Sequence, residues 1–282
     1  MNGRIIKLIS NDYTVLSEDK IYTCKSRGKF RNIKLTPLVG DIVKFDEKNN
    51  YILDILPRKN ELIRPPVSNI DQAFIISSVK NPDFSTNLLN KLLVLIEYNN
   101  IIPIICLTKL DLLNKEELEE INKYISYYKN IGYKVFINTE LEIIKNQFKD
   151  KYSIFTGQSG AGKSTLLNKL DGSLNIKTNE ISYALGRGKH TTRHVELLKI
   201  CDGFVADTPG FSSLDFYDMS NSDIRDNFIE FNDYKELCRY KDCMHDKEDN
   251  CEIKRKVEEG IILKSRYDDY LKFIHREIKS RW

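Results

Sequence analysis

The chain has 282 residues, which is enough for about two domains of ordinary size or three small ones. Hydrophobic residues make up 41% and charged residues 30%, a composition that supports a packed core and excludes wholesale disorder. No run approaches the roughly 18 apolar residues that a membrane-spanning helix needs. Residues 1–16 lack the apolar segment and cleavage site of a secretory signal. We therefore expect a cytoplasmic protein without a membrane partner.

The near balance of 44 basic and 41 acidic residues hides an uneven distribution. Residues 1–66 carry 13 Lys or Arg against 8 Asp or Glu, whereas residues 67–215 carry 17 of each. Residues 216–282 carry 14 against 16, but the last 19, residues 264–282, are basic with 6 against 3. A basic N-terminal module and a basic tail fit a polyanionic partner touched at two places. Solvated surface charge is an equal alternative.

Residues 4–56 have the pattern of short alternating strands separated by turns, with Gly40-Asp41 opening one of them. About five strands in 60 residues predict a small β-barrel, for which an OB-fold is the natural candidate. Pro57, Pro65 and Pro66 mark its boundary. The first predicted domain is therefore residues 1–66.

From Asn69 onward, apolar strand-like runs alternate with helices of ten or more residues. That alternation predicts a parallel, doubly wound α/β sheet, here assigned to residues 67–215. After about Phe216 the sequence becomes helical and charged, apart from a Cys-rich stretch. Residues 216–282 are predicted to form a third, helical domain.

One segment matches the phosphate-loop pattern G-x-x-x-x-G-K-[ST] and lies between a predicted strand and a predicted helix. Its glycines let successive backbone N–H groups turn toward phosphate, and the helix N-terminus adds its positive end. Lys163 is predicted to reach the β- and γ-phosphates of a nucleotide, and the Ser164 hydroxyl to bind Mg²⁺. The predicted loop comprises Gly157, Gln158, Ser159, Gly160, Ala161, Gly162, Lys163, Ser164 and Thr165.

Two further motifs indicate which nucleotide the phosphate loop binds. Asp207-Thr208-Pro209-Gly210 ends an apolar strand, so Asp207 can hold the Mg²⁺ shell and the Gly210 N–H can meet the γ-phosphate. Thr108-Lys109-Leu110-Asp111 follows a buried strand. The Asp111 carboxylate can accept two hydrogen bonds from the N1–H and exocyclic amine of guanine, a donor pair that adenine lacks. These motifs look like those of a GTPase, except that the base motif precedes the phosphate loop, which is the signature of circularly permuted GTPases.

The C-terminal region contains three cysteines and one histidine within 14 residues: Cys238, Cys243, His245 and Cys251. Three thiolates and an imidazole are a suitable ligand set for one tetrahedral structural zinc ion. Such an ion would supply folding free energy to a region too small for a large core. Cys24, Cys106 and Cys201 fall in strand-like runs and are predicted to lie in the core.

Barrel, permuted GTPase and Cys/His module together resemble the ribosome-small-subunit-dependent GTPase family, RsgA (also called YjeQ). The likeness covers essentially the whole chain, including the linking residues 57–72 and the stretch from Gly186 to His194. It implies an OB-fold, hydrolysis of GTP to GDP with Mg²⁺, zinc in the tail, and late maturation of the small (30S) ribosomal subunit. It also implies binding to that subunit, with slow hydrolysis that the subunit stimulates.

Carried onto this chain, the resemblance makes Gly188–His194 the first switch and Asp207–Gly210 the second. Thr192 is the choice for the Mg²⁺ and γ-phosphate contact, with Thr191 as the alternative. Thr108 departs from the commoner Asn and is expected to weaken a supporting hydrogen bond. A guanine-supporting loop would fall near residues 137–139, where the match is poor and no residue is assigned.

Phe211 follows Gly210 directly, so the Gln that orients water in Ras-like enzymes is missing. Our hypothesis is that His190 positions the attacking water once the ribosome orders the first switch, with His194 as the competing residue. A partner that completes such a site can be worth about 10³–10⁵-fold in rate.

Contact with ribosomal RNA is predicted at the barrel, because OB-folds bind nucleic acid through basic grooves and exposed aromatics. The helix near residues 264–282 is a second candidate contact, and the protein is expected to be a monomer. The barrel candidates are Lys25, Arg27, Lys29, Phe30, Arg31 and Lys34.

Other functions remain open from the sequence. One is an RNA-binding module whose GTP hydrolysis only times its release. A second is a P-loop kinase or ATPase acting on a small molecule, which the base motif disfavours. A zinc hydrolase is poorly supported, because four protein ligands leave no open position for water.

Overall fold

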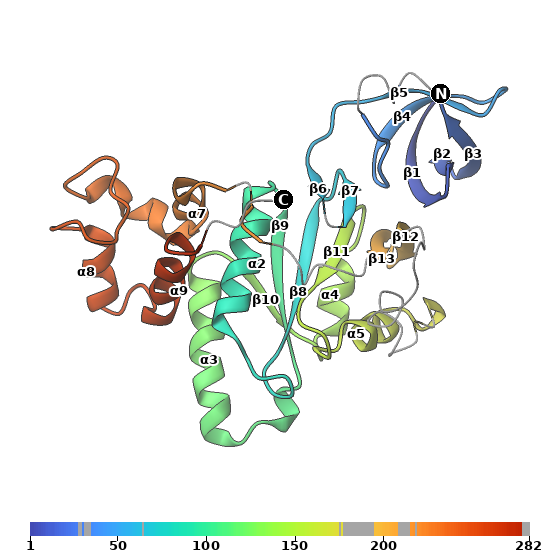
Figure 1. Cartoon of the computed structure of the whole chain (residues 1–282). Coiled ribbons are helices and arrows are strands. Elements are labelled where there is room, and N and C mark those ends of the chain that lie inside the picture. Colours follow the sequence, from blue (N-terminus) through green and yellow to red (C-terminus); the bar gives the residue numbers. More distant parts are fainter. Residues whose placement is uncertain are drawn as a thin grey trace.

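The computed structural model describes residues 1–27, 30, 35–63, 65–174, 176, 195–207, 215–217 and 219–277. Three lobes follow one another along the chain (Figure 1). We call them the barrel (β1–β5), the central lobe (β8–β13 with α2–α5) and the C-terminal lobe (α7–α9). In the part of the chain that is described, no helix combines the length and apolarity needed to cross a membrane.

The barrel confirms the predicted OB-fold. Its strands lie in the order β1-β2-β3-β5-β4, and pairing between β1 and β4 closes the ring. Alternate residues point inward, as Tyr13, Val15 and Ser17 do along β2, because side chains of a strand alternate between its faces. The strands are β1 (Asn2–Ile9), β2 (Asp12–Ser17), β3 (Lys20–Ser26), β4 (Ile42–Asp46) and β5 (Tyr51–Ile55).

A short hairpin, β6 (Glu61–Ile63) and β7 (Pro66–Ser68), follows the barrel. A bridge between Val39 and Val67 ties it back to the barrel. Arg58 connects the segment before the hairpin with the segment before β4. Its guanidinium donates to both carboxylate oxygens of the buried Asp41, at 2.7 and 2.8 Å. The proline-rich segment that the sequence marks as a boundary therefore contains ordered, paired strands.

The central lobe has the predicted α/β organisation. Its strands run in the order β10-β9-β8-β11-β13-β12, all parallel except β12, which pairs antiparallel with β13. The strands and helices are β8 (Gln72–Ser78), α2 (Thr86–Tyr98), β9 (Ile102–Thr108), the 3₁₀ turn η1 (Leu110–Leu112), α3 (Lys115–Asn130), β10 (Lys134–Ile137), α4 (Leu141–Asn146), β11 (Tyr152–Thr156), α5 (Lys163–Leu170), the 3₁₀ turn η2 (Gly172–Leu174), β12 (Val195–Ile200) and β13 (Gly203–Asp207).

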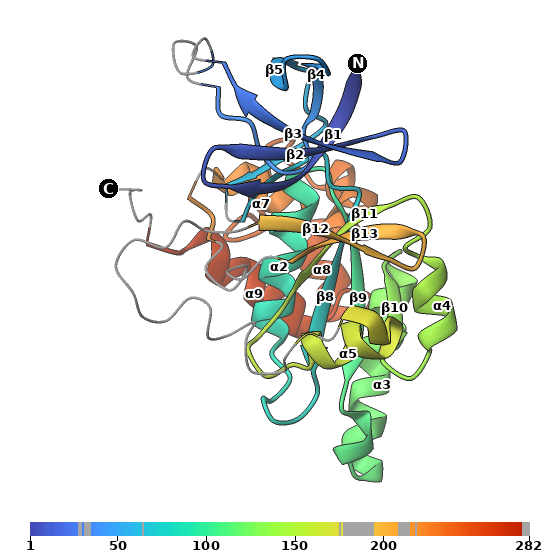
Figure 2. The same ribbon diagram turned by 90° about the vertical axis from the view of Figure 1, so that its right-hand side faces the viewer.

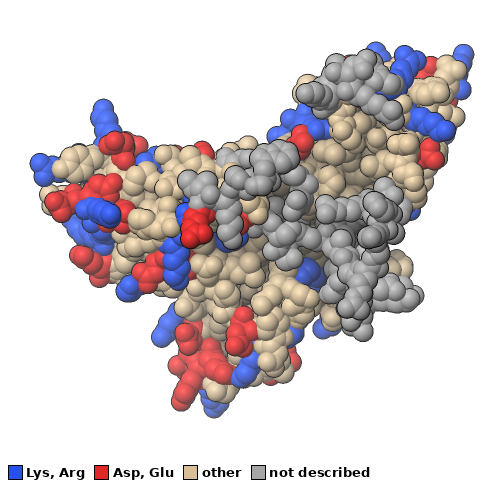
Figure 3. Space-filling view, in the orientation of Figure 1, with Lys and Arg blue, Asp and Glu red and all other residues tan. Residues whose placement is uncertain are grey.

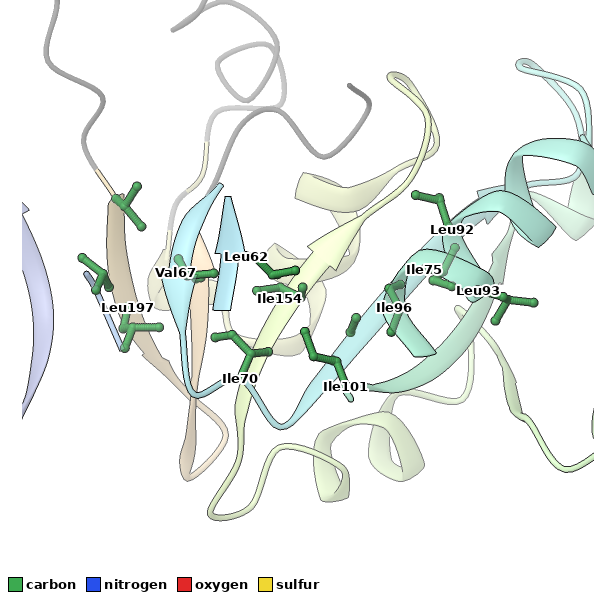
Figure 4. Close-up of a cluster of buried hydrophobic side chains, with 14 of the residues drawn as sticks. Leu62, Val67, Ile70, Ile75, Leu92, Leu93, Ile96, Ile101, Ile154 and Leu197 are labelled. Carbon is green, nitrogen blue, oxygen red and sulfur yellow. The ribbon is translucent and has the colours of Figure 1, made fainter. Parts of the chain in front are cut away.

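Helices cover both faces of this sheet, which explains why its strands are continuously apolar. Along β8, Ala73 and Ile75 face the cluster formed with α2 and α3, whereas Phe74 and Ile76 face the cluster formed with α4 and α5. Figure 4 shows the first cluster, with Ile75 among side chains of α2. The sheet is thus buried on both sides and holds its carboxyl-end loops on a rigid base.

The C-terminal lobe is built from α7 (Asn221–Asp226), α8 (Glu252–Glu258), α9 (Lys264–Ile274) and the 3₁₀ turns η4 (Ile229–Asp233) and η5 (Lys235–Leu237). Phe228, Phe231 and Tyr270 pack ring against ring at its centre. Helix α9 lies beside α2 of the central lobe (Figure 1). Because the cluster includes Val94 and Leu95 of α2, the two lobes share one core.

Two predictions about individual side chains were wrong, those for Phe30 and Cys201. Phe30, expected at an RNA-binding surface, is 3% exposed and belongs to the barrel core. Arg266, which lies in the predicted contact region 264–282, is fully buried and pairs with Glu230 at 2.6 Å, because α9 packs inside the fold. Cys201 is only half-buried in the turn between β12 and β13, whereas Cys24 and Cys106 lie in the core as expected.

Candidate functional site

The phosphate loop joins β11 to α5, as its sequence pattern requires. Gly157, Gly160 and Gly162 all have positive φ values, of 131°, 77° and 94°. Gly157 has no room for a side chain, since a Cβ placed there would lie 2.0 Å from the carbonyl oxygen of Ile76. The close approach of β8 and this loop therefore depends on glycine.

Lys163 turns back into the loop. Its Nζ donates to the carbonyl oxygens of Gly157 and Gln158, both at 2.8 Å. Burial lowers the pKa of Lys163 from its ordinary value, because desolvation disfavours the charged form. A bound phosphate would offer this amine a stronger, charged acceptor. Ser164, the predicted Mg²⁺ ligand, is buried in the first turn of α5.

The predicted base-recognition loop contacts the phosphate loop directly. Thr108, 2% exposed at the end of β9, donates its hydroxyl to the carbonyl oxygen of Ala161 at 2.7 Å. Thr108 thus makes a hydrogen bond that connects the two loops. Lys109 has a left-handed backbone, and its amine donates to the carbonyl oxygen of Asn81. Asp111 is exposed in η1, so its carboxylate is accessible to a base.

The strand order brings the third motif to the same edge of the sheet. β13 lies parallel to β11, with Ala206 opposite Ile154. The Asp207 backbone therefore reaches the carboxyl edge beside the phosphate loop, as expected for ligand sites in parallel sheets. The Asp207 side chain, residues 208–210, and the predicted switch residues His190, Thr191, Thr192 and His194 lie outside what the structure describes.

Residues 137–139, near which the guanine-supporting loop is expected, also reach the carboxyl edge of the sheet. β10 is the neighbour of β9, and the Asn138 N–H donates to the carbonyl oxygen of Leu107 at 2.9 Å. Residues 138–139 thus follow the strand next to Thr108. The pairing of β10 with β9 brings these residues there. A search of the sequence for Ser-Ala, a common form of the guanine-supporting loop, does not find them.

The predicted metal ligands come together in the C-terminal lobe. One ligand atom from each of Cys238, Cys243, His245 and Cys251 lies within 4.8 Å of the others. The Sγ atoms of Cys238 and Cys251 are 4.0 Å apart, and the His245 Nδ1 is 3.6 and 3.4 Å from them. Zinc bonds of about 2.3 Å to sulfur and 2.0–2.1 Å to nitrogen give tetrahedral edges of similar length. The donor set and its spacing therefore fit a tetrahedral cation.

Protonation in the cluster is set by burial. Desolvation lowers the pKa of His245 to about 4, so the imidazole is neutral, which is the form that binds metals. Burial likewise raises the pKa of the Cys243 thiol to about 12. A cation would have to displace that proton, and the thiolates it creates would then be held by the ion.

Backbone contacts fix the histidine loop. The Tyr267 hydroxyl donates to the carbonyl oxygen of His245 at 2.6 Å, and the Tyr270 hydroxyl donates to that of Met244. Because both tyrosines belong to α9, this helix connects the Cys/His cluster with α2 of the central lobe.

Comparisons with known proteins agree with this architecture. Residues 55–217 match the RsgA GTPase family, and residues 2–52 match the RsgA N-terminal domain. Small ribosomal subunit biogenesis GTPase RsgA 2 of Oceanobacillus iheyensis is 52% identical, covering 99% of this chain and 98% of its own length. Its Bacillus subtilis relative, Small ribosomal subunit biogenesis GTPase RsgA, is 47% identical, covering 99% and 98%.

Two solved structures have the same overall arrangement. The crystal structure of YloQ, a circularly permuted GTPase, is 41% identical with a TM-score of 0.83, covering 100% of this chain and 96% of that one. YjeQ from Thermotoga maritima is 34% identical with a TM-score of 0.84, covering 98% and 99%. The permuted order of motifs in this chain thus agrees with a solved structure described as a circularly permuted GTPase. This chain belongs to the RsgA family of circularly permuted GTPases.

Proposed function

We propose that this GTPase binds the small ribosomal subunit during its biogenesis and hydrolyses GTP faster on the subunit than alone. The relatives' names support the cellular process, and the comparisons give no support to a small-molecule kinase. The observation that carries the GTP-binding part of the proposal is the Thr108–Ala161 hydrogen bond, because it connects the loop proposed to read guanine with the phosphate loop.

The residues of the central lobe have distinct roles in this proposal. Asp111 accepts the two guanine donors, and the stem of Lys109 lies along the base. Loop N–H groups and Lys163 bind the phosphates, lowering the energy of the charge that develops as water attacks the γ-phosphorus. The products are GDP and inorganic phosphate. Mg²⁺, held through Ser164 and Thr192, would supply further charge neutralisation there.

We keep His190 as the residue that orients the attacking water, with His194 as its competitor. Neither lies in the described part of the chain, so the proposal rests on the sequence. His190→Ala should abolish subunit-stimulated turnover while His194→Ala preserves it. Unchanged stimulation in His190→Ala would overturn the assignment.

Zinc is the cation that the Cys/His cluster fits best. Four protein ligands would fill its coordination sphere, so its role is to fold the lobe rather than to activate water. Elemental analysis of the purified protein should give one zinc ion per chain. A different metal, or a substoichiometric content that added zinc does not raise, would contradict this assignment.

The barrel is proposed to contact ribosomal RNA, with Tyr51 replacing the buried Phe30 as the stacking aromatic. Tyr51 is 40% exposed, lies opposite Lys25 in the β3–β5 pair, and has the Arg27 guanidinium 6.0 Å from its ring centroid. Lys and Arg side chains gather at the outer rim of the barrel (Figure 3). A base stacked on an aromatic ring contributes about 1–3 kcal/mol.

This interface is tested by titrating purified small subunits with labelled protein. Tyr51→Ala should weaken binding by about 5–150-fold, the equivalent of that stacking free energy. Tyr51→Phe keeps the ring and should bind like wild type. If both variants bind equally well, the RNA contact lies elsewhere on the protein.

Partner choice can be tested by sedimentation. With a non-hydrolysable GTP analogue, the protein should sediment with small subunits and not with large ones, and GDP should weaken this association. Equal binding to both subunits would contradict the proposal. We further propose that the protein acts in the cytoplasm as a monomer. Sedimentation velocity tests the monomer, because its measured mass should match the 32.9 kDa of one chain.

A further inference from the structure

The barrel and the central lobe are joined by a continuous sheet. β1 of the barrel pairs antiparallel with β12, with Lys7 opposite Glu196 and Leu8 opposite Val195. In Figure 2 the β12–β13 pair lies directly against the strands of the barrel. The barrel strands therefore continue the sheet of the central lobe, and the two lobes are not connected by a linker alone.

In the sequence, the two predicted switches adjoin the ends of the β12–β13 hairpin. β12 begins at Val195, directly after the predicted first switch, and β13 ends at Asp207, the first residue of the predicted second. Five residue pairs, from Glu196–Asp207 to Ile200–Gly203, hold the hairpin together. A displacement of β12 would therefore be carried to β13.

A second connection crosses the same boundary through side chains. Arg4 of β1 places its guanidinium 3.6 Å from the ring centroid of Tyr152, the first residue of β11. The same guanidinium donates to the carbonyl oxygens of Gly40 at 3.0 Å and Asn69 at 3.3 Å. Arg4 thus contacts the barrel, the segment after the hairpin, and the strand that ends at the phosphate loop.

The contact continues to β13. The Tyr152 ring is stacked on Phe204, with centroids 5.1 Å apart and planes 4° from parallel. Arg4 and Phe204 thus both contact the Tyr152 ring at the amino ends of β11 and β13, a set that we call the Arg4–Tyr152–Phe204 stack. The carboxyl ends of these two strands lead to Gly157 and Asp207.

We propose that Arg4 is a positioning residue for subunit-stimulated GTP hydrolysis, acting through the Arg4–Tyr152–Phe204 stack to align the phosphate loop and the Asp207 strand with the barrel. The inference rests on the proposed function, since it needs a partner that engages the barrel. The contact of Arg4 with Tyr152 is a cation–π interaction and not an ion pair. The nearby Lys7–Glu196 ion pair, at 2.8 Å, leaves both side chains about one-third exposed and contributes little.

The test compares GTP turnover alone and at saturating small subunits for Arg4→Met, Arg4→Lys, Tyr152→Leu and Tyr152→Phe. Arg4→Met keeps an apolar stem but loses the guanidinium, so stimulated kcat should fall by about 5–150-fold, the usual range for coupling between sites. Turnover without subunits, GTP affinity and subunit affinity should stay at wild-type values. Tyr152→Leu should lose stimulation similarly, whereas Tyr152→Phe keeps the ring and should retain it.

Controls separate positioning from stability. Arg4→Met combined with Tyr152→Leu should be no worse than the poorer single variant, because both act through one stack. Arg4→Lys should restore part of the stimulation, because it returns a cation to the ring face. Lys7→Met removes a positive charge from the same strand and should leave stimulation intact.

The outcomes are distinguishable. Full stimulation in Arg4→Met, a parallel fall in its turnover without subunits, or an equal loss in Lys7→Met would overturn the inference while leaving the proposed function standing. A wild-type protein that small subunits do not stimulate would overturn both.

Discussion

Thr108 and Ala161 join two loops that lie 53 residues apart in the sequence, through a hydroxyl-to-carbonyl hydrogen bond of 2.7 Å. The first loop carries Asp111, which we propose reads the base, and the second carries Lys163, which we propose binds phosphate. Circular permutation reverses their order in the chain without separating them in space, because β9 lies beside β8 and β8 lies beside β11. The base and the triphosphate of one nucleotide can therefore be read together.

Thr108→Val tests this connection. It removes the hydroxyl but keeps the shape, leaving the Ala161 carbonyl without this donor. An unsatisfied buried acceptor costs about 1–3 kcal/mol, so GTP affinity should fall by about 5–150-fold. Fluorescent-nucleotide titration measures this change. Thr108→Ser keeps the hydroxyl and should bind close to wild type; an affinity unchanged in Thr108→Val would show that the bond does not support the site.

Asp111→Asn tests which base is read. An amide cannot accept two hydrogen bonds from guanine but can donate to the C2 carbonyl of xanthine. GTP affinity should fall by about 100-fold or more, toward the limit of about 10⁴–10⁵-fold for such sites. Binding of xanthosine triphosphate should rise in the same variant. Because Asp111 is exposed, thermal stability should not change. Retained GTP preference would place base recognition elsewhere.

The barrel, the α/β order and the Cys/His cluster could be predicted because each depends on local periodicity or spacing. Alternation along β2 and the continuous apolar run of β8 state directly which faces are buried. The phosphate loop is equally local, since its glycines stand in one short segment between a strand and a helix.

Cys251→Ser, or removal of metal by a chelator, tests the cluster. The lobe should lose its ordered histidine loop, since metal binding free energy is folding free energy in small metal domains. We expect a lower thermal unfolding midpoint and loss of bound zinc, with GTP affinity of the central lobe largely kept. Cys201→Ser, at a half-buried cysteine outside the cluster, is the matched control. Unchanged stability in Cys251→Ser would exclude a structural metal.

Arg266→Met tests the connection between the C-terminal and central lobes. Arg266 donates to Glu230 at 2.6 and 2.9 Å and to Asn90 of α2 at 2.8 Å, with no exposed surface. Removing it leaves the Glu230 charge buried, which costs about 3–5 kcal/mol. Denaturant unfolding followed by circular dichroism should show that loss.

The double variant Arg266→Met/Glu230→Gln should recover part of the stability, because it removes the stranded charge. Lys264→Met, which breaks an exposed ion pair with Asp268 on the same helix, should change stability by less than about 1 kcal/mol. An Arg266→Met variant as stable as wild type would mean that Arg266, with its hydrogen bond to Asn90, does not hold the lobes together.

Burial by tertiary packing is what the sequence could not show at two positions. Phe30 and Arg266 each sit in a basic run that looks solvent-exposed, yet tertiary packing buries both. A charged residue in an amphipathic helix gives no local sign of a partner 36 positions away, as Glu230 is from Arg266. The contact of β1 with β12 is equally invisible, because strand pairing between distant segments leaves no periodic trace.

The most direct test of the account is hydrolysis of GTP and ATP by the purified protein, with and without small ribosomal subunits. The account predicts turnover of GTP only, slow alone and rising by about 10³–10⁵-fold at most when subunits complete the site. Large subunits should have no such effect. Equal use of ATP, or GTP turnover that small subunits leave unchanged, would contradict it.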